Sequence, residues 1–241
     1  MKVTAKDLVK EYGKIRVVDE VSFSFEQGEV VGLLGPNGAG KTTTFYMITG
    51  LVQPNGGSVF FDDEDVTDWA MYRRARAGVG YLAQESSVFR RLSVDDNIKL
   101  VLEANGITGK KMQEKVDELA GGLHIEKIMD KPGGVLSGGE RRRVEIARAL
   151  ATEPKFILLD EPFTGIDPVT IEELQVIIQQ LAKQGIGILI TDHNVNATLS
   201  ITDRNYILID GKIFAEGGED EIRSNEHVKK FYLGHGVEDA S

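Results

Sequence analysis

Residues 30–42 read Val-Val-Gly-Leu-Leu-Gly-Pro-Asn-Gly-Ala-Gly-Lys-Thr, an apolar run followed directly by the pattern G-x-x-x-x-G-K-T. The run predicts a buried strand, and the lysine predicts the start of a helix. Glycines let successive backbone N–H groups converge on phosphate oxygens, and a helix N-terminus adds free donors and partial positive charge. We therefore expect a nucleotide phosphate-binding loop in which Lys41 reaches the β- and γ-phosphates and Thr42 holds Mg²⁺. The residues of this predicted loop are Gly35, Pro36, Asn37, Gly38, Ala39, Gly40, Lys41, Thr42 and Thr43.

The bulk composition is that of a soluble globular protein. The chain has 241 residues, of which 41% are hydrophobic and 27% are charged, so it can build a sizeable core. It contains no cysteine, which excludes disulfides and thiolate metal sites. Neither a signal peptide nor a run of about 18 apolar residues is present, so we expect a cytoplasmic protein that reaches the membrane only through partners.

The formal net charge of −10 argues against broad nucleic-acid binding, for which a basic face is typical. The one dense basic run, residues 141–143, has acidic neighbours at Glu140 and Glu145. This run is interpreted as a solvated helix face, with a phosphate or DNA patch as the alternative. We therefore expect no nucleic-acid partner.

Alternating strand-like and helical segments predict an α/β fold with a parallel sheet, of the P-loop NTPase kind. The apolar runs that predict its buried strands are residues 30–34, 156–159, 186–191 and 206–209. Residues 170–183 repeat apolar positions at helical spacing, which predicts a helix packed on the sheet. Shorter runs near the start predict an N-terminal antiparallel β subdomain, and these runs are residues 3–8, 21–25 and 59–61.

The middle of the chain, residues 86–151, contains helical segments and few strand candidates. These helical segments are residues 95–105, 110–121 and 140–151. We interpret the region as a helical lobe inserted into the α/β core. Residues 1–241 are then a single domain, whose core comprises residues 1–85 and 152–234 and whose last residues, 235–241, form a frayed tail.

Two acidic residues, Asp160 and Glu161, follow the apolar run at residues 156–159. In open α/β sheets, ligands bind at the carboxyl ends of the strands. Adjacent strand residues point to opposite sides, so the two carboxylates can do different work. We expect Asp160 to lie on the Mg²⁺ side and Glu161 to orient or deprotonate the attacking water.

Residues 137–140, Ser-Gly-Gly-Glu, have the S-x-x-E pattern of a capping box at a helix start. Two glycines weaken the first helical turn, so capping alone does not account for them. They are explained if a phosphate approaches the backbone closely at the helix N-terminus. We expect Ser137, Gly138, Gly139 and Glu140 both to cap the helix and to bind an anion.

Three further side chains are candidates for contact with the nucleotide or its metal ion because of their positions in the sequence. His193 follows the run at residues 186–191 and is expected to contact phosphate at the same sheet edge. Gln84 is expected to end a short strand at the junction with the helical lobe, where a neutral amide can ligate Mg²⁺ or position water. Tyr12 precedes the first core strands, and its ring is expected either to stack on adenine or simply to pack.

The motifs occur in one order along nearly the whole chain: the loop with Lys41, then Gln84, Leu-Ser-Gly-Gly-Glu at residues 136–140, Leu-Leu-Asp-Glu-Pro at residues 158–162, and His193. This order and spacing resemble the nucleotide-binding domain of ATP-binding cassette (ABC) transporters. The resemblance implies an enzyme that hydrolyses ATP with Mg²⁺. It also implies a homodimer that closes head to tail over two ATP molecules.

The resemblance assigns roles by matching position. Tyr12 would stack on adenine, and residues 137–140 would complete the site of the opposite subunit. Glu161 would be the catalytic base, His193 would contact the γ-phosphate, and Gln84 would sense both Mg²⁺ and the membrane partner. The implied metal-side residues are Thr42, Gln84 and Asp160.

Longer stretches resemble one branch of this family, the ATPases of bacterial lipopolysaccharide export. These stretches are residues 42–47, 89–94, 137–148, 191–195 and 227–234. The resemblance implies two ATPase copies and two transmembrane subunits, which extract lipopolysaccharide from the inner membrane and move it toward the outer membrane. The ATPase would lie peripherally on the cytoplasmic face of the inner membrane. The alternatives are the ATPase of a branched-chain amino-acid importer and a soluble, non-transport ABC ATPase.

Residues 84–92 lie where the predicted core meets the predicted lobe, and we expect a helix of the membrane subunit to dock there. Phe89 offers an apolar anchor, and Arg90 and Arg91 offer donors, which are the kinds of side chain that dominate interfaces. The alternative is that Phe89 packs within the lobe.

Overall fold

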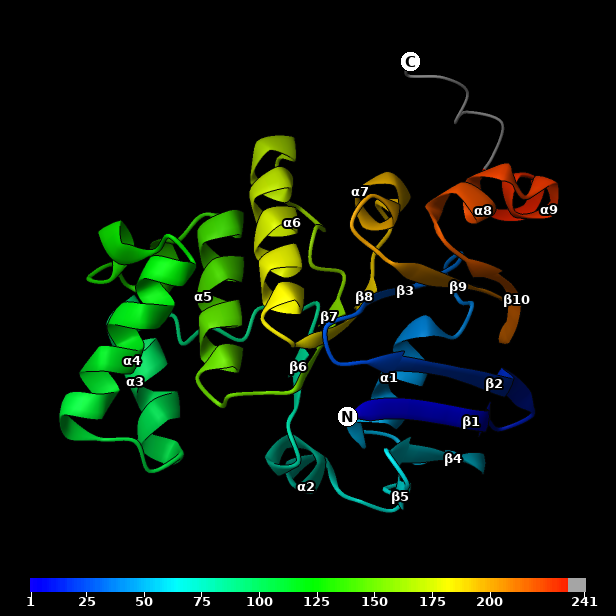
Figure 1. Ribbon diagram of the computed structural model, residues 1–241, viewed down its shortest axis with the longest axis horizontal. Coiled ribbons are helices and arrows are strands. Elements are labelled where there is room, and N and C mark those ends of the chain that lie inside the picture. The colour runs from blue at the N-terminus through cyan, green and yellow to red at the C-terminus, as the bar shows by residue number, and fades with distance from the viewer. Residues whose placement is uncertain (234–241) are drawn as a thin grey trace.

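The computed structural model describes residues 1–233, and the frayed tail predicted for residues 235–241 lies outside them. The described residues form a six-stranded sheet, a four-stranded sheet and the helices around them (Figure 1). The strands are β1 (Lys2–Tyr12), β2 (Ile15–Glu26), β3 (Val30–Leu34), β4 (Gly56–Phe61), β5 (Glu64–Asp65), β6 (Val79–Leu82), β7 (Phe156–Asp160), β8 (Gly187–Thr191), β9 (Arg204–Ile209) and β10 (Lys212–Gly217). The helices are α1 (Lys41–Thr49), α2 (Met71–Arg76), α3 (Val94–Ala104), α4 (Gly109–Gly122), α5 (Gly138–Leu150), α6 (Pro168–Lys183), α7 (Val195–Leu199), α8 (Glu219–Ser224) and α9 (Glu226–Val228). Short turns are the 3₁₀ helices η1 (Glu126–Ile128) and η2 (Gly133–Val135) and the π-helical η3 (Lys229–Leu233).

The six-stranded sheet runs in the order β10-β9-β3-β8-β7-β6. Its strands pair in parallel except at the edge, where β10 is antiparallel to β9. The predicted α/β fold with a parallel sheet is therefore confirmed. The sequence did not predict β10, because its apolar run is only three residues long (213–215) and its residues up to Glu216 alternate between exposed and half-buried positions. Since parallel strands end at one edge, the loops after β3, β6, β7 and β8 gather there.

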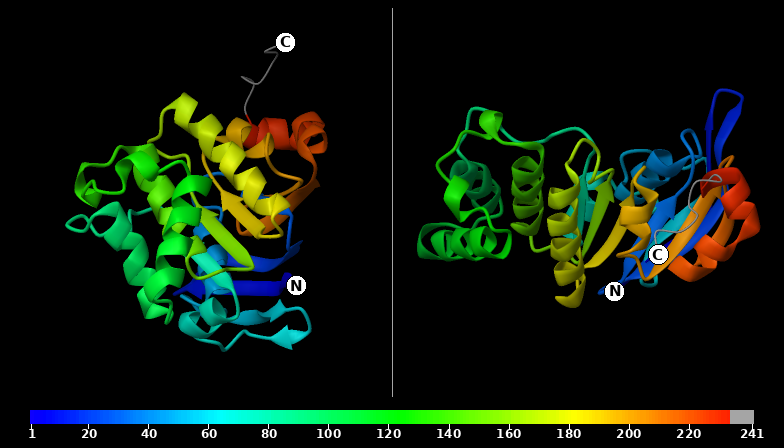
Figure 2. Two further views of the ribbon diagram at one scale, coloured as in Figure 1. Left: turned by 60° about the vertical axis from the view of Figure 1, so that its left-hand side comes forward. Right: turned by 90° about the horizontal axis from the view of Figure 1, so that it is seen from above.

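The four-stranded sheet has the order β2-β1-β4-β5, and its strands pair antiparallel. This confirms the antiparallel sheet predicted near the N-terminus, although β1 and β2 extend well beyond the runs at residues 3–8 and 21–25. Figures 1 and 2 place α3, α4 and α5 together at one end of the molecule and β1, β2 and β4 toward the other. The three middle helices match the predicted segments, except that α5 begins two residues earlier, at Gly138.

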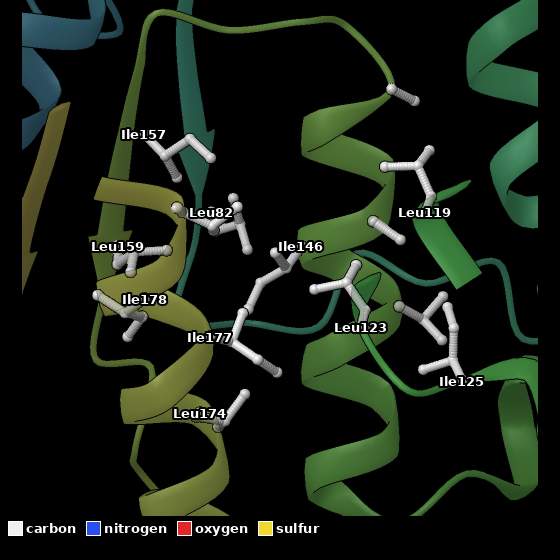
Figure 3. Packing of buried hydrophobic residues seen from close by; sticks show 14 of the residues in the cluster. Leu82, Leu119, Leu123, Ile125, Ile146, Ile157, Leu159, Leu174, Ile177 and Ile178 are labelled. Carbon is white, nitrogen blue, oxygen red and sulfur yellow. The ribbon is translucent and has the colours of Figure 1, made fainter. Parts of the chain in front are cut away.

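Side-chain alternation along β7 divides the core into two parts. Phe156 and Leu158 join the buried cluster under β1, β2 and α1, whereas Ile157 and Leu159 join the cluster shared with α5 and α6. Figure 3 shows Ile157 and Leu159 facing the apolar side of α6. Both faces of this strand are covered, which explains why its sequence is a continuous apolar run.

A buried arginine fixes the far end of α1. Arg74, in α2, has no exposed surface, and its Nη1 donates to the Met47 and Ile48 carbonyl oxygens, at 2.7 Å each. Its other nitrogens donate to the carbonyl oxygens of Thr67 and Trp69. The bonds to Met47 and Ile48 satisfy acceptors that the C-terminus of α1 otherwise leaves open. Burial lowers the pKa of Arg74 to about 10, so the guanidinium remains charged at neutral pH.

We expect Arg74→Met to lower the free energy of unfolding by at least about 3 kcal/mol, because several carbonyl oxygens lose a charged donor. Arg73→Met is the matched control on the same helix, where the guanidinium instead lies 3.8 Å from the centre of the Trp69 ring. That variant should lose only about 1 kcal/mol. Urea denaturation measures both, and equal losses would contradict the role given to Arg74.

Candidate active site

The predicted phosphate loop joins β3 to α1, as the sequence indicates. Gly40, directly before the helix, has φ +99°, and a Cβ there would lie 2.5 Å from the Val17 carbonyl oxygen. Only glycine fits this position on both counts. Lys41 is buried, and its Nζ donates to the carbonyl oxygens of Gly35 (2.8 Å) and Pro36 (2.9 Å). Burial lowers the pKa of Lys41, against the opposing effect of Glu161 and Asp160.

Asp160 ends β7 and is held at two points. The Arg142 guanidinium donates to its backbone oxygen at 3.1 Å, and the Tyr81 hydroxyl donates to its Oδ2 at 3.2 Å. Burial raises the pKa of Asp160, and burial likewise raises the pKa of Tyr81. Within residues 1–233, the buried Oδ1 of Asp160 has no hydrogen-bond partner. A buried oxygen of this kind fits a ligand that the chain itself does not supply.

Glu161 carries a carboxylate whose two oxygens are both engaged. His193 Nε2 lies 2.6 Å from its Oε1, and Gln84 Nε2 donates to its Oε2 at 2.6 Å. Thr164 adds a weaker hydroxyl bond of 3.2 Å. The Glu161 backbone has φ +49°, a conformation that costs free energy for a non-glycine residue and that clusters at functional sites. The structure thus brings together three residues that the sequence singled out separately.

Asp192 is a functional candidate that the sequence reasoning missed. It is buried directly before His193, and its carboxylate accepts the backbone N–H groups of Phe163 and Asn194, at 2.8 Å each. These bonds tie the turn after Glu161 to the turn that carries His193. Burial raises the pKa of Asp192. The sequence feature that could have identified Asp192 is its position directly after the apolar run at residues 186–191.

The capping box predicted at residues 137–140 is present. Ser137 Oγ accepts from the Glu140 amide at 3.2 Å, and Glu140 Oε2 accepts from the Ser137 amide at 2.8 Å. The Ser137 amide lowers the pKa of Glu140. Glycine is required at position 139 for a packing reason that the sequence did not show. A Cβ there would lie 2.1 Å from Thr170 Cγ2 of α6. Among the described residues, no hydrogen bond or ion pair joins this motif to the phosphate loop or to Glu161.

The interpretation of residues 141–143 as a solvated helix face is wrong for Arg142, which is only 5% exposed. Its Nη1 donates to the Ala83 carbonyl oxygen and to Glu145 Oε2, at 3.0 Å each. Glu145 in turn accepts the Ser87 amide at 2.8 Å. The basic run in the sequence does not reveal the distant partners of Arg142, which are the carbonyl oxygens of Ala83 and Asp160. The helix α5 is therefore bonded to both sides of Gln84.

Tyr12 and Phe89 are exposed, at 50% and 45% of their surface. Tyr12 ends β1 with Lys10 Nζ 5.3 Å from its ring centre, and its adenine-stacking role stays a prediction. The Arg148 guanidinium lies 4.7 Å from the Phe89 ring centre, and Arg90 and Arg91 are exposed beside it. Phe89 is therefore not fully packed within the helical region.

The oxygen donors near the loop fit Mg²⁺ in character. Thr42 offers a hydroxyl and Asp160 offers the unpaired Oδ1, and hard oxygen ligands are what Mg²⁺ prefers. Residues 1–233 contain no group of three or more His, Asp or Glu side chains arranged to hold a metal ion. Such a site would therefore need further oxygens from a bound phosphate, which is usual for Mg²⁺ in nucleotide sites.

The sequence pattern of the family described as ABC transporter matches residues 18–164. The chain belongs to this family. It is 52% identical over 233 residues to the lipopolysaccharide export system ATP-binding protein LptB of Escherichia coli K12, covering 96% of this chain and 97% of the relative. It is 54% identical over 230 residues to the LptB protein of Acidithiobacillus ferridurans, covering 95% of each chain.

Solved structures agree with the fold. An ATP-binding cassette of an ABC transporter, MJ1267, superposes with a TM-score of 0.88 at 31% identity, over 96% of this chain and 98% of that one. The cassette MJ0796, solved as a dimer, superposes with a TM-score of 0.80 at 26% identity, over 90% and 98% of the two chains. Both the family and the fold predicted from the sequence are therefore confirmed. Among the described residues, none of the helices combines the length and apolar character that crossing a bilayer requires.

We expect Gly139→Ala to lower the free energy of unfolding by about 1–3 kcal/mol, the usual cost of overpacking. Thr170 cannot yield easily, because its hydroxyl donates to Asp167 Oδ2 at 2.7 Å. Gly138→Ala is the matched control, since the nearest atom to its new Cβ is the Gly165 oxygen at 3.4 Å. This control should change stability by less than about 1 kcal/mol. Chemical denaturation that ranks the two variants in the opposite order would refute the packing explanation.

Proposed function

We propose that this chain is the ATPase subunit of a bacterial lipopolysaccharide exporter, bound peripherally on the cytoplasmic face of the inner membrane. The support for lipopolysaccharide as cargo is that the two relatives, which align over nearly their whole length, are lipopolysaccharide export system ATP-binding proteins. The observation that carries the ATPase activity is the Glu161 carboxylate, whose two oxygens are held by Gln84 and His193 at the sheet edge that carries the phosphate loop.

Binding of ATP begins at the loop before α1. Lys41 exchanges the Gly35 and Pro36 carbonyl oxygens for oxygens of the β- and γ-phosphates, and the loop amides and the helix N-terminus supply further donors. Glu161 then orients the attacking water in line with the γ-phosphate and accepts its proton. Since Gln84 and His193 fix the carboxylate before the substrate arrives, little reorganisation is needed in the reaction.

The residues that would hold Mg²⁺ are those that offer oxygen atoms near the phosphate loop. Thr42 and Asp160 Oδ1 would hold Mg²⁺, and the carbonyl oxygen of Gln84, whose amide nitrogen donates to Glu161, would be a third donor. Mg²⁺, when bound, neutralises charge on the phosphate oxygens. Asp160 stays in place because Arg142 and Tyr81 bond its backbone and its side chain.

We propose that the working unit is a homodimer in which residues 137–140 bind the nucleotide held by the opposite copy. Ser137 and Gly138 are exposed at the start of α5 and take no part in the contacts around their own Glu161. Their position at a capped helix N-terminus suits a phosphate. A solved dimeric relative of the same fold supports the assembly.

The surface formed by Gln84, Phe89, Arg90 and Arg91 is our proposed contact with the transmembrane subunits. This proposal is supported by the exposure of Phe89, Arg90 and Arg91. They follow Ser87, whose amide donates to Glu145 of α5. An exposed aromatic ring with neighbouring guanidinium groups has the composition of an interface centre.

We expect Glu161→Gln to lower ATP turnover roughly 10²- to 10⁴-fold, because the variant loses the base. Its affinity for ATP should stay near that of the wild type, since the glutamine makes no phosphate contact. Lys41→Ala is the complementary variant and should lose nucleotide affinity. Steady-state turnover and binding of a fluorescent ATP analogue separate the two effects. Near wild-type turnover of Glu161→Gln would remove Glu161 from the mechanism.

We expect Phe89→Ala to keep ATP turnover of the isolated chain within about twofold, while membrane subunits co-purify in much smaller amounts. Phe214→Ala is the matched control, because Phe214 is similarly exposed (43%) but lies on β10 at the far edge of the sheet. Pull-down from detergent-solubilised membranes measures the difference. Normal assembly of the Phe89 variant would exclude the proposed surface.

The cargo is tested by purifying the tagged chain from gently solubilised membranes and identifying the proteins and lipids that come with it. Transmembrane subunits that carry lipopolysaccharide would support the exporter. Amino-acid permease subunits would move the chain to an importer and leave the ATPase chemistry intact. Soluble partners alone would contradict the transport function.

A further inference from the structure

We propose that Tyr81 is a positioning residue that orients the Asp160 carboxylate for the divalent cation accompanying ATP. This inference rests on the proposed function, which places Asp160 on the metal side of the nucleotide. Neither the motif pattern nor the family resemblance assigns a role to Tyr81.

The register of two neighbouring strands brings the pair together. Tyr81 on β6 is paired with Leu158 on the parallel strand β7, and Asp160 follows Leu158 by two residues. Since side chains two apart share one face of a strand, Tyr81 and Asp160 lie on the same face. The Tyr81 hydroxyl spans the diagonal and donates to Asp160 Oδ2 at 3.2 Å.

The bond differentiates the two oxygens of one carboxylate. Oδ2 accepts from Tyr81, whereas the buried Oδ1 has no partner within residues 1–233. The last torsion of an aspartate side chain is broad, so a carboxylate held only through its backbone is free to turn. The bond from Tyr81 removes this freedom and leaves Oδ1 as the available ligand atom.

Tyr81 also contacts α1, the helix that carries Thr42, the other residue proposed to hold Mg²⁺. Its ring packs edge to face on the Tyr46 ring of α1, with centroids 6.2 Å apart and an interplanar angle of 87°. Tyr46 lies four residues after Thr42, so the two side chains occupy the same side of α1. The Thr42 side of the helix and the Asp160 carboxylate are thus connected through two tyrosine rings.

Simple core packing does not require the hydroxyl. The Tyr81 ring packs against the buried cluster under α1, and phenylalanine would fill that space equally well. A phenol adds a donor that a neighbouring carboxylate can accept. Removal of this oxygen alone therefore separates orientation of Asp160 from packing.

The experiment measures the affinity of mant-labelled AMP-PNP, a fluorescent ATP analogue that is not hydrolysed, in saturating Mg²⁺ and in EDTA. The ratio of the two dissociation constants is the gain in affinity due to the cation. We expect Tyr81→Phe to reduce this gain about tenfold, the effect of losing one hydrogen bond to a charged group. The affinity in EDTA should stay unchanged, which also shows that the variant is folded.

Tyr206→Phe is the matched control, a buried tyrosine on β9 of the same sheet that lies away from Asp160. It should leave both affinities unchanged. Asp160→Asn should reduce the cation-dependent gain, and adding Tyr81→Phe to it should have no further effect, because Tyr81 acts through this carboxylate.

Three results would overturn the inference. If Tyr81→Phe keeps the full gain while Asp160→Asn lowers it, Tyr81 has no such role and the proposed function stands. If the double variant loses more than Asp160→Asn alone, Tyr81 acts by another route. If Asp160→Asn itself keeps the full gain, the metal-side assignment in the proposed function fails together with the inference.

Discussion

The carboxylate of Glu161 lies where three chain segments meet, between the amide of Gln84 and the imidazole of His193. This meeting depends on the sheet, because β6, β7 and β8 are parallel neighbours that end at the same edge. The backbone of Glu161 takes a left-handed conformation, and its amide donates to the Thr191 oxygen at the end of β8. The contacts of Gln84 and His193 with this one carboxylate therefore require the order of strands, their register and a strained turn together.

The same edge is bonded to the helical region through α5. Arg142 donates both to the Ala83 oxygen before Gln84 and to the Asp160 oxygen on β7. A buried guanidinium is costly unless it is paired, so these bonds and the ion pair with Glu145 are needed to keep it in place. The helix that begins with residues 137–140 is consequently one hydrogen-bonded unit with the segment around Gln84 and with β7.

Sequence reasoning predicted the features that depend on local pattern. The apolar runs predicted β3, β7, β8 and β9, and helical periodicity predicted α6, because burial repeats over neighbouring residues. Contacts between distant residues were not predictable in this way. The burial of Arg142, the close approach of Gly139 to Thr170 and the bond from Tyr81 to Asp160 each depend on a partner many residues away. A pattern of residue types contains no information on which distant backbone oxygen will face a given side chain.

The central claim is that each ATP is enclosed by the phosphate loop of one copy and residues 137–140 of another. The chain has no cysteine, so single cysteines at the exposed positions Asn37 and Ser137 can be placed on separate copies in a Glu161→Gln background. Mixing Asn37→Cys with Ser137→Cys copies and adding a short bis-maleimide tests the claim directly. The account predicts cross-linked dimers of the two different variants with ATP and Mg²⁺ and none with EDTA. Absence of this cross-link when ATP is bound would contradict the account.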